Sequence, residues 1–106
     1  MPPRAAPFEV GIEIVAVHFI DDTHVDIEFA LPGVTSAGSG IETGFTVNGQ
    51  AVAPFGSGAD TNIEATLVGS CSIGDPVVVV GGTSDNFTLV DPTTNNIFPF
   101  TGEVVA

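Results

Sequence analysis

Two histidines flank an acidic turn, and they are the first residues whose chemistry must be tested. His18 and His24 stand on either side of Asp21-Asp22 in the stretch "HFIDDTH". A zinc site needs three or four nitrogen, sulfur or oxygen ligands in tight geometry. The chain has two histidines and one cysteine in all, so nothing nearby completes such a set. We interpret both histidines as ordinary strand-end residues and assign no metal ligand.

Aspartates in the predicted loops raise a second question, because Ca²⁺ and Mg²⁺ prefer oxygen ligands. No EF-hand spacing occurs in the sequence. Turn aspartates commonly bond their own backbone instead. Two readings stay open: solvated turn aspartates, or one loop-bound Ca or Mg ion, which could also bridge subunits. The aspartates concerned are Asp21, Asp22, Asp60, Asp75, Asp85 and Asp91.

Nucleophilic chemistry finds no support in the sequence. Cys71 is the single cysteine, so it forms no intrachain disulfide, and it lacks the cationic neighbours that would lower a thiol pKa. The glycine-flanked serines lie in no G-x-S-x-G elbow, and no lysine follows the "GSG" stretches as a phosphate loop requires. Tyr and Trp are absent, which removes the usual sugar-stacking platform. We therefore predict no enzyme and no catalytic residue; the serines considered are Ser36, Ser39, Ser57 and Ser70.

The charge balance limits the kinds of partner that the chain is expected to bind. The chain carries 13 acidic residues against one basic residue, Arg4, for a net charge of -12. Such a surface repels phosphate backbones and anionic lipid, so we expect no nucleic acid and no membrane partner. High salt shortens the Debye length to about 3 Å at 1 M, which suits an acidic protein from a halophilic source. Ordinary solubility through negative charge is the alternative.

The elements that would position these residues begin with a proline-rich arm, residues 1–8, followed by one β domain, residues 9–106. The arm begins with Met and has no apolar run of signal-peptide length, which favours synthesis in the host cytoplasm. We predict that the arm is an interface, with Arg4 paired to a carboxylate of a neighbouring subunit; a disordered terminus is the alternative. Its interface candidates are Pro2, Pro3, Arg4, Pro7 and Phe8, and the loop residues Phe55, Phe87 and Phe98 are further candidates or caps of the core.

Alternating apolar residues predict the strands that follow. In "DDTHVDIEFAL" the alternation from Val25 to Leu31 predicts a strand with Val25, Ile27, Phe29 and Leu31 facing inward. In "EVGIEIVAVHFID" the alternation slips by one residue between Ile14 and Val15, which predicts a bulge or a change of sheet. "FTVNGQAV", residues 45–52, predicts a hairpin about Asn48-Gly49, because Asn-Gly favours the positive φ angles of a tight turn.

Further strands are predicted in the second half. "IEATL" places Ile63, Ala65 and Leu67 on one face, and "VVVV", residues 77–80, has the pattern of a strand buried on both sides. "NFTLV" is a short strand, and "IFPFTGEVVA" is a final strand in which Pro99 indicates an edge or a bulge. About seven short strands without helical periodicity predict an all-β fold, an antiparallel immunoglobulin-like β-sandwich.

The order of these segments resembles bacterial and archaeal immunoglobulin-like domains of S-layer and surface-repeat proteins. The resemblance is carried by "DDTHVDIEFALP", "FTVNGQAV", "IEATL", "VVVVGGTSD" and "DPTTNNIFPFTGEVV". As a single domain with an arm, the chain also resembles capsid decoration (cement) proteins of tailed viruses.

That second resemblance implies a non-enzymatic structural protein of the virion, placed on the capsid surface. It implies binding to the major capsid protein, stabilisation of the shell and a homo-oligomer, with a trimer at the local symmetry axes as one option. Two alternatives remain: a cell-surface or adhesin-type immunoglobulin-like module, or a tail or fibre component of the virion.

Overall fold

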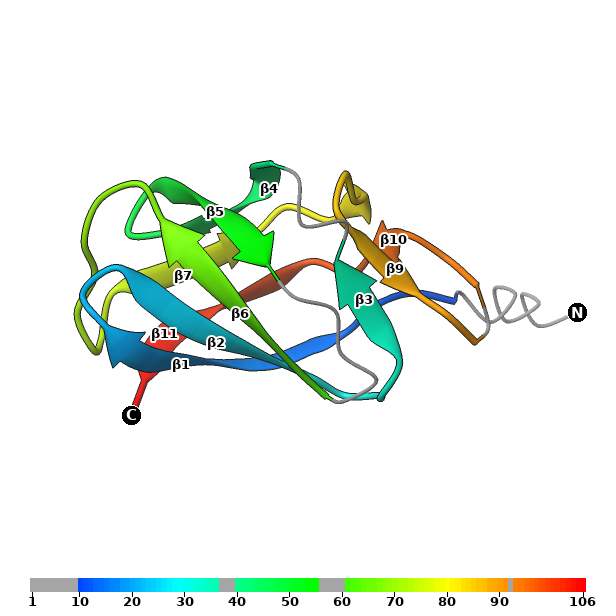
Figure 1. Ribbon diagram of the computed structural model, residues 1–106, viewed down its shortest axis with the longest axis horizontal. Helices are drawn as coiled ribbons and strands as arrows, with labels where there is room; N and C mark the ends of the chain where they lie inside the picture. The colour runs from blue at the N-terminus through cyan, green and yellow to red at the C-terminus, as the bar shows by residue number, and fades with distance from the viewer. Residues whose placement is uncertain (1–9, 37–39, 56–60, 92) are drawn as a thin grey trace, which may run out of the picture.

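The computed structural model describes residues 10–36, 40–55, 61–91 and 93–106 (Figure 1). The arm of residues 1–8 lies outside the described residues. The predictions made for it are therefore not addressed by the fold, and the same holds for three loop residues. The residues concerned are Pro2, Pro3, Arg4, Pro7, Phe8, Ser39, Ser57 and Asp60.

The described residues form eleven strands and no helix. In chain order they are β1 (Ile14–Asp21), β2 (His24–Phe29), β3 (Val34–Ser36), β4 (Glu42–Val47), β5 (Gln50–Phe55), β6 (Asn62–Leu67), β7 (Pro76–Val79), β8 (Gly82–Thr83), β9 (Phe87–Leu89), β10 (Asn96–Ile97) and β11 (Phe100–Val105). The all-β prediction is confirmed. The predicted number of about seven strands was too low, because β3, β8 and β10 have only two or three residues and gave no pattern that could be recognised as separate elements. The short strand predicted in "NFTLV" is confirmed as β9.

Seven of the strands close a barrel in the order β1-β11-β7-β4-β5-β6-β2. β1 runs parallel to β11, and every other neighbouring pair in the barrel is antiparallel. Two small sheets, β3 with β9 and β8 with β10, lie at the end of the barrel away from the C-terminus (Figure 1). The sequence predicted a purely antiparallel sandwich; the first strand instead closes the sheet on the last one.

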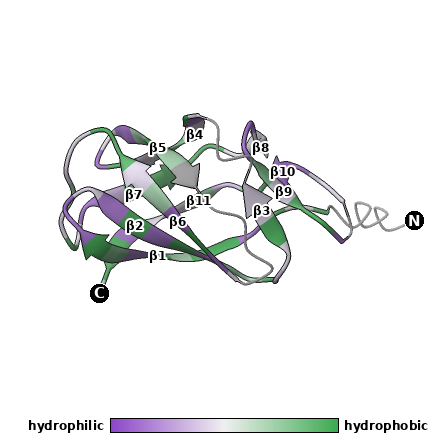
Figure 2. Ribbon diagram, viewed as in Figure 1, coloured by the Kyte–Doolittle hydropathy of each residue, from purple (hydrophilic) through white to green (hydrophobic). Residues whose placement is uncertain are grey.

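β1 and β2 are the two strands that the alternation predicted, and they pair with each other antiparallel. Hydrophilic and hydrophobic residues alternate along β2 (Figure 2), and Val25, Ile27 and Phe29 are buried. The register shifts between Ile14 and Ala16, which confirms the predicted bulge. Leu31 is exposed, contrary to the prediction, because the strand ends at Phe29 and the chain then turns away through Pro32-Gly33.

The hairpin at residues 45–52 is confirmed as the connection of β4 and β5. Asn48 has a φ of 52° and Gly49 a φ of 75°, the pair of left-handed residues that a two-residue type I′ turn requires. Val47 pairs with Gln50 directly beside the turn. This local geometry fixes the register, so Phe45, Val47 and Val52 all enter the core.

β7 corrects the prediction of a strand buried on both sides. Val77 and Val79 are buried, but Val78 is 42% and Val80 is 71% exposed. β7 lies between β4 and β11 in the barrel wall, so one face of it packs inward and the other forms the outer surface. In this valine run Val77 and Val79 therefore pack in the core, while Val78 and Val80 lie on the outer surface.

The core is one cluster of apolar side chains inside the barrel and under the two small sheets. Phe87 of β9 is fully buried, and its ring meets Phe29 edge-on at a centroid distance of 5.5 Å. Its role as an interface candidate is therefore wrong, and the alternative of a core residue holds. Phe98 is half-buried against Gly11, where an added Cβ would come within 2.7 Å of the ring. Phe55 lies in β5, and its side chain is outside the described residues.

The predicted final strand is split in two. β10 ends at Ile97, Phe98 and Pro99 interrupt it, and β11 begins at Phe100. Pro99 thus marks the break that the sequence indicated, because proline cannot donate to a ladder. The first half joins a small sheet, and the second half enters the barrel wall.

Candidate functional site

The outer surface of β1, β2 and β6 carries carboxylates. Asp26 pairs with His18 on one side and with Glu64 on the other, so a row of titratable groups crosses three strands. Glu28 lies two residues further along β2, on the same outer side. We call Asp26, Glu28 and Glu64 the acidic face.

His18 is bound within this face. Its Nε2 lies 2.7 Å from Glu28 Oε1, and its Nδ1 lies 3.2 Å from the backbone oxygen of Ala106. Both ring nitrogens face acceptors, so the doubly protonated imidazolium satisfies both bonds. The hydrogen bond to Glu28 is the main cause that raises the pKa of His18 above 6.5, followed by the bond to Ala106. The residue is an ion-pair partner across two strands.

His24 and Asp21 meet at the turn that joins β1 to β2. His24 Nδ1 lies 2.7 Å from Asp21 Oδ1, which also accepts the backbone N–H of Thr23 at 2.9 Å. The hydrogen bond from His24, ahead of the one from Thr23, lowers the pKa of Asp21 below 3.8. This arrangement fits the reading of a turn aspartate that bonds its own backbone.

No group of three or more His, Cys, Asp or Glu side chains that could hold a metal ion occurs within residues 10–36, 40–55, 61–91 and 93–106. His18 and His24 bind different carboxylates rather than one common point. Asp75 also bonds locally, because its Oδ2 accepts the backbone N–H of Ser72 at 2.7 Å. A loop-bound Ca or Mg ion stays a prediction, since Asp60 lies outside the described residues.

Cys71 is buried next to the same turn. Its Sγ lies 3.7 Å from the backbone oxygen of Asp21. Burial raises the pKa of the thiol, and the nearby charges of Asp75, Asp22 and Asp21 raise it further. A protonated thiol is a poor nucleophile, so its surroundings agree with the prediction of an inert cysteine.

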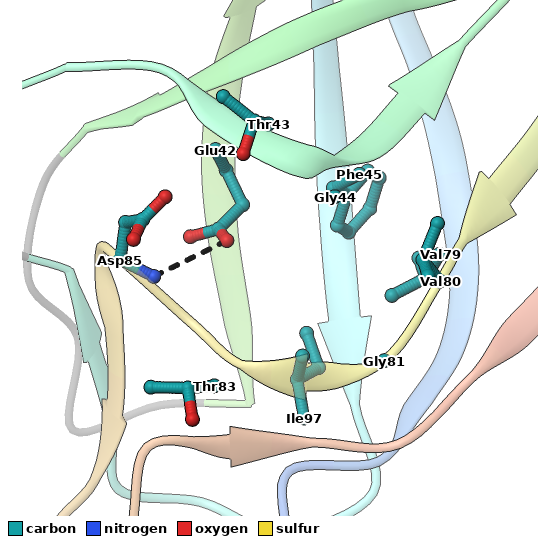
Figure 3. A pocket seen from close by; sticks show the side chains of 10 residues that line it. All are labelled: Glu42, Thr43, Gly44, Phe45, Val79, Val80, Gly81, Thr83, Asp85 and Ile97. Carbon is teal, nitrogen blue, oxygen red and sulfur yellow. Dashed lines mark hydrogen bonds between the residues drawn. The ribbon is translucent and has the colours of Figure 1, made fainter.

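Glu42, at the start of β4, is a buried carboxyl group that sequence reasoning missed. It is 4% exposed, and its Oε1 accepts the Ser84 hydroxyl at 2.7 Å and the Asn86 backbone N–H at 3.0 Å. Its Oε2 faces the backbone N–H of Asp85 at 3.3 Å (Figure 3). The carboxyl group therefore ties β4 to the segment that leads into β9.

A hollow of about 250 Å³ opens beside Glu42 (Figure 3). Phe45, Val79 and Ile97 form apolar walls, while Glu42, Asp85 and two threonine hydroxyls supply polar atoms. The described residues that line it include no His, Cys, Lys or Arg. Because the carboxyl oxygens of Glu42 already accept three hydrogen bonds, we interpret it as a structural link rather than as a general acid or base.

The opposite side of the barrel presents a different surface. β7 lies three strands away from both β2 and β6 around the ring, so it faces away from the acidic face. Thr46, Val78 and Thr101 form one row across β4, β7 and β11, and Val80 follows next to Gly44. We call Thr46, Val78, Val80 and Thr101 the neutral face.

Comparisons with known proteins give a fold likeness alone. No family model matches the chain, and no curated protein matches it. One solved structure is similar, the crystal structure of the S-layer protein rSbsC(31-844), with a TM-score of 0.56 and 19% sequence identity. The match covers 92% of this chain and 14% of that chain. At this identity the likeness concerns the fold of the domain.

The described residues include no helix that is long and apolar enough to cross a membrane.

Proposed function

We propose that this chain is a non-enzymatic structural module of a repetitive protein shell. The observation that carries the proposal is the fold likeness, over 92% of the chain, to a short part of an S-layer protein. The local chemistry supports it, because the described histidines are bound to carboxylates and the thiol is buried. A module of this kind contributes a rigid body and two contrasting surfaces.

Two shells fit the proposal. The sequence favours a virion, in which the chain would decorate the capsid, bind the major capsid protein and stabilise the shell. The fold likeness favours a layer on a cell surface, because the similar structure belongs to an S-layer protein. We give the cell-surface setting equal standing for that reason, and a tail or fibre position is a variant of the virion setting.

The same proposal takes the barrel as a flattened immunoglobulin-like sandwich. One sheet would consist of β4, β7 and β11, and the other of β1, β2, β6 and β5. The β4–β5 hairpin and the parallel pair of β1 with β11 would then be the two places where the sheets join. A first strand that pairs with both the second and the last strand supports this description.

Localisation of the protein in the organism that produces it tests the proposal. An antibody raised against the purified chain would be used on washed cell envelopes, on purified virus particles and on the soluble fraction. We expect the signal in one of the two shell fractions at many copies per particle or per cell. A signal confined to the soluble fraction would contradict a shell role.

A further inference from the structure

The neutral face is unusual for so acidic a chain. Val78 and Val80 expose 42% and 71% of their surface. Val78 lies between Thr46 on one side and Thr101 on the other, and Val80 follows next to Gly44. Among the described outward-facing residues of β4, β7 and β11, Glu103 is the only charged one. Asp85 lines the same hollow as Val80, so the face is low in charge but not free of it. Exposed valines in such surroundings favour a protein contact.

Charge decides which partner fits. Each chain carries a net charge of -12, so two copies repel wherever their carboxylates approach one another. A basic partner would be attracted to the acidic face instead, on the far side of the barrel. A second copy meets less repulsion at a surface with few carboxylates, and the neutral face also exposes valine side chains that a contact can bury. The neutral face therefore suits a second copy of this chain.

We infer that two copies of this chain associate through their neutral faces, with Val78 and Val80 at the contact. The inference rests on the proposed shell function, because it names the surface by which neighbouring modules of the shell meet. A pair formed by the same surface on both copies has two-fold symmetry. The acidic faces then point away from each other, on the two outer sides of the pair.

The association has a characteristic salt dependence. The contact is apolar, whereas the remaining charges of the two copies repel across the solvent. Raising the salt concentration to 1 M shortens the Debye length to about 3 Å and screens this repulsion. Association should therefore strengthen with salt, opposite to a contact held by ion pairs.

Sedimentation velocity of the full chain tests the inference at 0.15 M and 1 M NaCl over a range of concentrations. We expect a monomer–dimer equilibrium whose dissociation constant falls at least about tenfold at 1 M. Val80→Glu should remove the dimer at both salt concentrations, and Val80→Thr, which keeps the shape and adds no charge, should weaken it. Val90→Glu is the matched control: Val90 is 54% exposed, lies after β9 and is outside the neutral face. Circular dichroism spectra check that each variant is folded.

The outcomes separate the two proposals. A wild-type chain that stays monomeric at both salt concentrations, or a Val90→Glu variant that loses the dimer as Val80→Glu does, overturns the neutral-face contact. A folded monomeric Val80→Glu variant that still enters the shell fraction at wild-type level also overturns it, while the shell function stands. A wild-type dimer that is lost in Val80→Glu but is absent from every shell fraction supports the contact and overturns the shell function.

Discussion

Replacement of Glu42 by alanine tests a buried side chain that accepts three hydrogen bonds. The carboxyl group is nearly fully buried, and so are Ser84 and Asn86, which donate to it. Ser84 Oγ in turn accepts the backbone N–H of Phe87 at 2.9 Å. The Glu42 carboxyl group thus binds Ser84, and Ser84 in turn accepts the amide of Phe87, the first residue of β9, whose side chain is fully buried.

The loss of stability follows from the hydrogen-bond donors that the substitution leaves without an acceptor. A hydrogen bond to a charged group contributes about 1.5–3 kcal/mol, and a buried donor without a partner costs about 1–3 kcal/mol. The Asn86 amide keeps a weaker partner, because Ser84 Oγ lies 3.3 Å away. The longer contact from Asp85 adds little. We therefore expect Glu42→Ala to lower the free energy of unfolding by about 3 kcal/mol.

Glutamine is the matched control at this position. Both short bonds end on Oε1, so a glutamine carbonyl placed there keeps them. Its amide group would face only the Asp85 N–H, at the 3.3 Å contact. The glutamine NH2 group and the Asp85 N–H are both donors, so this one long contact would be lost. We expect Glu42→Gln to lower the free energy of unfolding by about 1 kcal/mol.

Urea unfolding followed by far-ultraviolet circular dichroism measures both variants, since the chain has no Trp or Tyr for fluorescence. With an m value of about 1 kcal/mol per M urea for a small domain, Glu42→Ala should lower the midpoint by roughly 3 M. A midpoint within about 0.5 M of the wild type would refute the role of Glu42 as a structural link. Equal losses for Ala and Gln would refute the assignment of the two short bonds to Oε1.

Three further predictions follow from the core and the titratable groups. Phe87→Ala should cost about 4 kcal/mol in urea unfolding, as expected for a fully buried phenylalanine; a loss below about 1 kcal/mol would contradict its place in the core. Cys71 should react with a thiol reagent far more slowly in the native chain than in urea, and equal rates would contradict its raised pKa and burial. His18 should titrate above 6.5 by NMR, and Glu28→Gln should bring its pKa down towards that value. Because the folded state binds the His18 proton more tightly than the unfolded state, its contribution to stability is complete below pH 6.5 and is lost as pH rises through the folded-state pKa. The stability difference between wild type and His18→Gln should therefore shrink as pH rises through this range, and a constant difference would contradict the ion pair.

Local signals in the sequence predicted local structure well. Asn48-Gly49 specified its turn through backbone angles that few other residues adopt, so the hairpin could be predicted without its surroundings. The alternation from Val25 to Phe29 likewise reports a strand with one buried face. Pro99 correctly marked an interruption, because a missing N–H acts at the position where it occurs.

What could not be predicted depends on partners distant in the chain. Four valines in a row indicate burial, but whether the second face of β7 is covered depends on other layers of the fold. The closure of the barrel depends on β1 meeting β11, whose pairing joins Val17 to Val104. Glu42 has the same charge as the many exposed acidic residues, so nothing in its sequence neighbourhood distinguishes it. Its role appears only when Ser84 and Asn86 are brought beside it.

The closed barrel also determines how this chain can associate. An open sheet presents a row of unpaired backbone groups at its edge, and a second chain can add a strand there. In the described structure β1, the first strand of the barrel, pairs with β11, the last one, so the ring of seven strands has no free edge. The strands outside the ring are only two or three residues long, which offers little for a neighbour to pair with. The proposed association through Val78 and Val80 therefore uses side chains on the outer face of the ring and needs no added strand.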